Sequence, residues 1–116
     1  MTRNLDSTFA ALADPARRNI IELLQQRPRC PSEVADTLQM SRPAMSRHLR
    51  ILRSAGLIDQ ESSEQDARVR MIRLRRAPFS ELRSWVDHVE AFWEDQLSAF
   101  KAHAERTVER APKRSR

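Results

Sequence analysis

The stretch from Ser41 to Ile58, SRPAMSRHLRILRSAGLI, combines four arginines and one histidine with no acidic residue, although the whole chain has 16 Asp and Glu residues. A guanidinium group donates several hydrogen bonds in a fixed planar fork, which suits phosphates and the edges of bases. The stretch is therefore typical of a surface that lies against dense negative charge. For one cluster alone, a simply solvated helix face is the plainer interpretation.

A second acid-free cluster follows in residues 67–80, ARVRMIRLRRAPFS, which carry five arginines. Residues 80–105 reverse the sign, with six acidic side chains against two basic ones, within a net charge of +5. Two basic clusters around a short linker are harder to explain as solvated surface than one. The segregation predicts a basic face for a polyanion and an acidic face turned elsewhere.

Length and composition indicate one small domain, which we expect to span residues 1–116. No apolar run approaches the roughly 18–20 residues of a membrane span, and charged residues such as Asp6 and Asp14 interrupt any signal sequence. The sequence therefore predicts a cytoplasmic protein without a membrane partner. The single cysteine, Cys30, excludes an internal disulfide, which fits a reducing compartment.

Periodicity and capping residues predict a mainly α-helical fold with one small β-hairpin. Asp14-Pro15, Ser32, Ser41 and Ser80 are the expected helix starts. The expected segments are residues 1–30 for two N-terminal helices, 31–54 for a helix-turn-helix, 57–75 for the hairpin, 80–105 for a long helix and 106–116 for a flexible basic tail.

The helix expected after residue 41 has two distinct sides. At 100° per residue, its apolar residues fall in one narrow sector, while Arg47 and Arg50 project from the opposite side. Gly56, the only glycine in the chain, follows the helix and predicts a residue with positive φ there. The apolar residues of this helix are Met45, Leu49 and Leu52.

A short helix, a tight turn, a basic helix and a two-stranded ribbon together predict a winged helix-turn-helix. An α-helix fits the major groove of DNA, and its free N-terminal N–H groups favour a nearby phosphate. The ribbon arginines, Arg68 and Arg70, would then lie over an adjacent backbone or minor groove. Phosphate contacts set position and affinity, whereas base contacts specify sequence.

SRPAMSRHLRILRSAGLI closely resembles the recognition segment of the ArsR/SmtB family of bacterial transcriptional repressors, especially in Ser-Arg-His-Leu at 46–49 and Ala-Gly-Leu at 55–57. FAALADPARRNIIELL, residues 9–24, is similar to the N-terminal signature of that family, and the resemblance extends over residues 9–100. It implies a homodimeric repressor that binds a partly palindromic operator in double-stranded DNA and leaves it when an unknown inducer binds. The expected DNA-binding residues are Ser41, Arg42, Pro43, Ala44, Ser46, Arg47, His48, Arg50, Arg68 and Arg70.

Two positions depart from the family pattern, which often has glycine before the recognition helix and at the tip of the wing. This chain has Gln39 and Asp66-Ala67 there, so the sequence leaves the wing conformation open. His48 lies closer to the buried side of its helix than to the outer one. A structural hydrogen bond and a phosphate contact are therefore equally open for it.

The last helix, within FSELRSWVDHVEAFWEDQLSAF, carries a wide apolar stripe that includes both tryptophans of the chain. A small domain can cover one side of such a helix but not the whole stripe. We therefore expect dimerisation through this helix, with folding back onto its own domain as the alternative. The expected interface residues are Leu82, Trp85, Val86, Val89, Phe92, Trp93, Gln96 and Phe100.

Some members of the family sense metals through two thiolates on the third helix. Aligned on the Ser-Arg-His-Leu core, Cys30 takes the first thiolate position, but Ser32 takes the second, and a hydroxyl is a poor ligand for soft metals. The last helix, with Asp87, His88 and His103, offers no ligand pair at helical spacing. We expect no metal and no cofactor, and a thiol-responsive repressor that uses Cys30 is an alternative.

Catalysis has little support, because the three histidines are scattered and the chain has no tyrosine and no glycine-rich phosphate loop. We therefore expect a DNA-binding regulator rather than an enzyme, and we assign no catalytic residue. The alternative from another class is a winged-helix protein-interaction module that does not bind DNA. That alternative predicts a neutral outer face on the helix at 41–54.

Overall fold

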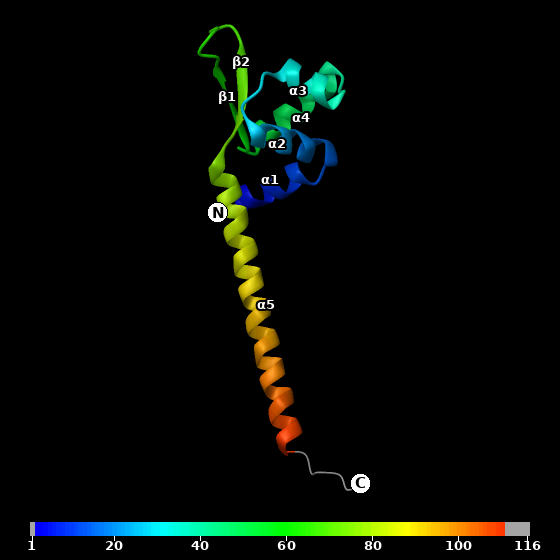
Figure 1. Ribbon diagram of the computed structural model, residues 1–116, viewed down its shortest axis with the longest axis vertical. Coiled ribbons are helices and arrows are strands. Elements are labelled where there is room, and N and C mark those ends of the chain that lie inside the picture. Colours follow the sequence, from blue (N-terminus) through cyan, green and yellow to red (C-terminus); the bar gives the residue numbers. More distant parts are fainter. Residues whose placement is uncertain (1, 111–116) are drawn as a thin grey trace. The chain divides into compact units, whose positions relative to one another are not determined.

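The computed structural model describes the backbone of residues 2–110 and the side chains of residues 5–108. Four helices, a hairpin and a long last helix follow one another (Figure 1), which confirms the predicted mainly α-helical class with a small β-hairpin. None of the helices in the described range is both long and apolar enough to span a membrane. The elements are α1 (Thr2–Leu12), α2 (Pro15–Gln26), α3 (Pro31–Leu38), α4 (Arg42–Ser54), β1 (Ile58–Ser62), β2 (Arg70–Leu74) and α5 (Arg76–Arg110).

The starts of α2 and α4 follow the capping residues in the sequence. Asp14 accepts hydrogen bonds from the backbone N–H groups of Ala16, at 2.7 Å, and Arg17, at 3.4 Å. Ser41 accepts one from the N–H of Ala44 at 3.3 Å. Both helices place a proline in their first turn, where no intrahelical donor is needed. The two predicted starts are confirmed.

The start of α3 differs from the prediction. Cys30, not Ser32, precedes the helix, and Pro31 occupies its first position. Because proline has a fixed φ and needs no donor, it is preferred at the first position and moves the start upstream of Ser32. The hydroxyl of Ser32 lies 3.3 Å from the sulfur of Cys30 instead of capping a backbone N–H.

The core lies among α1, α2, α3, α4 and the hairpin, which Figure 1 shows gathered together. The N–H of Arg29 donates to the carbonyl of Ile72 at 3.1 Å, and the N–H of Ile72 donates back at 2.7 Å. This bridge ties β2 to the connection between α2 and α3, so the hairpin is held by backbone bonds as well as by packing. The buried apolar residues are Ala11, Ile20, Leu24, Val34, Ala35, Met45, Leu49, Leu52, Leu57, Ile58 and Ile72.

The hairpin pairs β1 and β2 in antiparallel register, from Ile58 opposite Leu74 to Ser62 opposite Arg70. Its tip closes without glycine, because Asp66 supplies the turn. The side chain of Asp66 accepts from the N–H of Arg68 at 3.0 Å, and its carbonyl accepts from the N–H of Val69 at 3.0 Å. The wing conformation that the sequence left open is therefore an Asp-centred turn.

The last helix begins at Arg76 rather than at Ser80, and Pro78 lies in its first turn, where its missing N–H costs no intrahelical bond. The predicted tail at 106–116 is helical as far as Arg110, and residues 111–116 lie outside the described residues. Backbone contacts divide the chain after Leu82 into two units. The first contains the core described above, and the second consists, in its described part, of the remainder of α5.

Candidate nucleic-acid interface

One side of α4 packs into the core, and the other faces solvent. Met45, Leu49 and Leu52 are 2%, 4% and 0% exposed. Arg47 and Arg50 are exposed on the outer side. The two sides are thus those predicted from helical spacing, and packing of the apolar residues fixes which side chains α4 presents outward.

The arginines of α4 have no carboxylate partner in the described part of the chain. Among the described side chains, none of Arg42, Arg47 and Arg50 forms an ion pair, and the same holds for Arg53. This face therefore carries positive charge that no neighbouring acid neutralises. The arginines with a carboxylate within 4 Å are Arg17, Arg27, Arg29, Arg68, Arg73 and Arg83.

The N-terminus of α4 adds donors to the same face. Ser41 and Pro43 are exposed, as is Ser46 one turn further along, while Ala44 is half-buried. The first turn of a helix leaves backbone N–H groups without intrahelical acceptors, and the helix dipole places partial positive charge there. Ser41 satisfies the N–H of Ala44, Pro43 has no N–H, and the N–H of Met45 donates to the carbonyl of Ser41. The N–H of Arg42 is therefore the backbone donor of this turn that is left for a phosphate oxygen.

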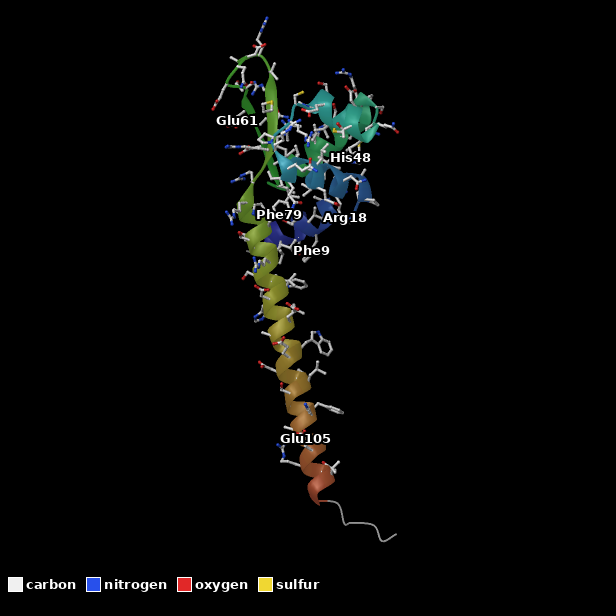
Figure 2. The ribbon with its side chains drawn as sticks, viewed as in Figure 1. Phe9, Arg18, His48, Glu61, Phe79 and Glu105 are labelled. Carbon is white, nitrogen blue, oxygen red and sulfur yellow. The ribbon has the colours of Figure 1, made fainter. Side chains whose placement is uncertain are left out.

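His48 is half-buried on α4 and is labelled in Figure 2. Its Nδ1 lies 3.4 Å from Nη1 of Arg17, a residue near the start of α2. Arg17 was not among the predicted site residues. The run Asp-Pro-Ala-Arg-Arg at 14–18 marks a helix start, but no pattern in the sequence shows which of its two arginines reaches α4.

The two wing arginines occupy different positions. Arg70 is the first residue of β2 and is exposed. Arg68 lies in the turn instead of in the predicted strand, with a side chain that is 91% exposed and an Nε 3.3 Å from Oδ1 of Asp66. Because the turn around Asp66 ends only at Val69, the second strand begins at Arg70 and does not include Arg68.

Cys30 is partly buried, and the hydrogen bond between its thiol and the Ser32 hydroxyl holds its pKa below the ordinary value. A backbone N–H from Glu33 lowers the pKa further, against the opposing effect of burial. Within the described residues, no group of three His, Cys, Asp or Glu side chains is arranged to hold a metal ion.

The side chains of the expected dimer stripe share one face of α5. At 100° per residue, the eight predicted residues fall within about 120° of the helix circumference. Trp93 is 59% exposed and Phe100 is 72% exposed, and Trp85, Val86 and Phe92 are exposed as well. Large apolar side chains of this kind are seldom left in water over such a length.

Two helices joined by a tight turn, with an arginine-rich second helix and a hairpin beyond it, define a winged helix-turn-helix domain. The family model described as "Bacterial regulatory protein, arsR family" matches residues 14–60. The transcriptional repressor SdpR of Bacillus subtilis is 33% identical over 61 residues, which are 53% of this chain and 68% of that relative. The protein belongs to the ArsR family.

A solved structure described as an ArsR family transcriptional regulator, RHA00566, superposes with a TM-score of 0.71 at 30% identity, covering 81% of this chain and 94% of the other. The HTH-type transcriptional regulator Rv2034 of Mycobacterium tuberculosis is 45% identical over 56 residues, which are 48% of this chain and 52% of that protein. The chain spans about half the length of the first curated relatives it matches.

Proposed function

We propose that the protein is a homodimeric, sequence-specific DNA-binding regulator that represses transcription from its operator and leaves it when an inducer binds. The supporting observation is the outer face of α4, where Arg42, Arg47 and Arg50 have no carboxylate partner while the opposite face is buried. A protein-interaction module would need no such charge. Because a bacterial regulator must reach the chromosome, we also infer that the protein acts in the cytoplasm.

In the proposed complex, α4 enters the major groove of double-stranded DNA. Arg47 and Arg50 project to base edges or phosphates. The hydroxyl of Ser46 forms one hydrogen bond with a base, as donor or as acceptor. Ser41 and the backbone N–H and side chain of Arg42 face a phosphate, and Pro43 and Ala44 allow the backbone of the helix to approach the duplex closely. The buried Met45–Leu49–Leu52 side keeps this orientation fixed.

The wing supplies contacts outside the major groove. Arg70 lies at the start of β2, and Arg68 extends from the turn that Asp66 stabilises. The exposed side chain of Arg70 can reach a phosphate of the adjacent backbone, and the side chain of Arg68, which is 91% exposed, can do so by leaving Oδ1 of Asp66. Because these contacts are electrostatic, they add affinity and position rather than sequence preference.

The spacing of the α5 stripe supports the proposed dimer. Six residues alternate steps of four and three, the heptad pattern of two helices that pack along each other. Covering the exposed part of one Trp93, roughly 150 Å² at about 25 cal/mol/Å², contributes on the order of 4 kcal/mol per copy before the cost of association. The heptad residues are Leu82, Val86, Val89, Trp93, Gln96 and Phe100, and Trp85 and Phe92 flank them.

A dimer places two copies of α4 on one DNA molecule. Recognition helices about 34–36 Å apart reach successive major grooves on one face of the duplex. Phosphates repel the acidic residues of α5, which include Glu90, Glu94 and Asp95. This repulsion favours a dimer in which α5 pairs with the α5 helix of the second copy and does not contact the DNA.

Selection of bound fragments from sheared genomic DNA of the source organism tests the proposal. The full chain should retain a small set of fragments that share an inverted repeat, with half-site centres about 10–10.5 base pairs or a multiple apart. The Arg47→Ala/Arg50→Ala double variant is the matched control and should retain none of them. Retained fragments without a shared motif would refute sequence-specific binding.

A further inference from the structure

The side chain of Arg17 is held in place by the end of α1. Its Nε–H donates to the carbonyl of Ala11 at 2.6 Å, and its Nη2 donates to the carbonyl of Ala10 at 3.3 Å. Oδ2 of Asp14 lies 3.7 Å from Nη1, and the side chain is only 13% exposed. Because the guanidinium is planar and rigid, these contacts fix the direction in which Nη1 points.

That direction leads to the recognition helix, where Nη1 of Arg17 lies 3.4 Å from Nδ1 of His48. A guanidinium has donors and no acceptor, so Nδ1 of His48 must be the acceptor in this contact. An imidazole that accepts through Nδ1 is neutral and carries its hydrogen on Nε2. Arg17 thus selects one tautomer of His48.

The other nitrogen of the ring is left available to a ligand. No described residue forms a hydrogen bond with Nε2 of His48, and no buried side-chain nitrogen or oxygen in the described part of the chain lacks a partner. Nε2 is therefore accessible to solvent. His48 lies one residue from Arg47 and borders the exposed face of α4, where a helix in a groove meets the phosphates of the groove wall.

We propose that Arg17 is a positioning residue that selects the His48 tautomer with its hydrogen on Nε2, with the Nε2–H group aimed at a phosphate oxygen of the bound DNA. The inference rests on the proposed DNA binding. It assigns His48 both of the roles that the sequence left open, a structural hydrogen bond through Nδ1 and a phosphate contact through Nε2. Arg17 itself touches no DNA. It connects the end of α1 and the start of α2 to the recognition helix through one ring.

The tautomer can be measured in the free protein by two-dimensional NMR that correlates the ring nitrogens and carbon-bound protons of His48. At neutral pH, the expected result is a protonated Nε2 and an unprotonated Nδ1 whose nitrogen signal moves when Arg17 is replaced by Met. A protonated Nδ1, or no change of that signal in Arg17→Met, would overturn the inference. Arg18→Met is the matched control, because Arg18 donates to the carbonyl of Leu12 at 2.7 Å, whereas the hydrogen bond to His48 comes from Arg17 (Arg18 and His48 are labelled in Figure 2).

The phosphate contact is tested with a generic 30-base-pair duplex, since this contact does not depend on sequence. His48→Gln, whose amide can reach the Nε2 position, should bind within about 3-fold of the unchanged protein, and His48→Asn about 10-fold more weakly. Arg17→Met should weaken binding about 5-fold alone but less than about 2-fold in the His48→Gln background, since the two act as a unit. Equal effects of Arg17→Met in both backgrounds would show a purely structural role and would overturn the proposal.

The salt dependence separates a neutral donor from a cation. The slope of log K against log salt should be the same for His48→Gln and His48→Asn as for the unchanged protein, because a neutral ring displaces no counterion. A slope smaller by about 0.9 per subunit would mean that His48 binds as an imidazolium, against this inference. Unchanged protein that fails to bind the duplex would instead refute the proposed function, and the NMR result would still decide the pairing of Arg17 with His48.

Discussion

Gln39 ends α3 in the same way that Gly56 ends α4. Both residues have a left-handed backbone, with φ of 54° and 78°, and Gln39 is the only non-glycine residue with positive φ in the described chain. In each case the next N–H donates five residues back, from Met40 to Ala35 at 2.9 Å and from Leu57 to Leu52 at 3.0 Å. Glycine adopts this conformation at little cost, whereas a residue with a Cβ is strained in it.

Replacing Gln39 by Gly should therefore raise the free energy of unfolding, by about 0.5 kcal/mol after the added entropy of the unfolded chain is subtracted. Gly56→Ala should lower it by about 1 kcal/mol, although the added Cβ would meet only Nη1 of Arg75 at an ordinary 3.7 Å. Urea titration measures both. Thr37→Gly, at an exposed site inside α3, is the control and should destabilise by about 1 kcal/mol. A lower free energy of unfolding in Gln39→Gly would contradict the claim that the left-handed backbone strains Gln39.

The cap of α2 predicts a specific dependence of stability on pH. The backbone N–H of Ala16 is the main cause that lowers the pKa of Asp14, and the N–H and charge of Arg17 lower it further. A carboxyl whose pKa is lower in the folded than in the unfolded chain stabilises the fold above its ordinary pKa of 3.8, and this contribution is lost as the pH falls through the folded value.

Thermal unfolding of Asp14→Asn between pH 7 and pH 2 tests this. The difference in Tm between the unchanged protein and the variant should be largest near neutral pH and should shrink below about pH 4, since Asn caps helices without a charge. Asp87→Asn, at an exposed carboxylate within α5, serves as the control. A Tm difference that stays constant down to pH 2 would show that the charge of Asp14 has no part in the cap.

The apolar stripe of α5 predicts that Trp93→Arg converts the proposed dimer into monomer. A charged group in place of a tryptophan at the centre of a heptad seam removes apolar burial and places two like charges opposite each other. Analytical ultracentrifugation gives the mass directly. Ser98→Arg adds the same charge on the other side of the helix and should stay dimeric, as its exposure and position outside the stripe indicate. If Trp93→Arg still sediments as a dimer, the proposal that the α5 stripe forms the dimer interface is refuted.

The sequence predicted those features that depend on one helix at a time. Met45 and Leu49 are buried and Arg47 is exposed because a 3.6-residue period fixes which side chains share a face. The start of α2 and the left-handed Gly56 were predicted for the same reason, since a cap and its helix lie within a few residues.

Features that depend on distant contacts or on competing local preferences were missed. Arg29 pairs with Ile72 across the fold, and Arg17 reaches His48 from another helix, and neither contact leaves a periodic signal. At α3, Pro31 and Ser32 both mark a helix start, and the proline prevails. The wing tip lacked its expected glycine, but the side chain of Asp66 closes the turn by another route.

The central claim, that the arginines on the outer face of α4 bind the phosphates and bases of duplex DNA, is tested most directly by the salt dependence of binding. Affinity for the selected operator should fall steeply with salt, with a slope of about −0.9 for each phosphate neutralised. For Arg47→Ala/Arg50→Ala, the affinity should collapse and the slope should lose at least about 0.9 per subunit, while the fold persists and the control Arg83→Ala binds as the unchanged protein does. An affinity and slope unaffected by the double substitution would contradict the account.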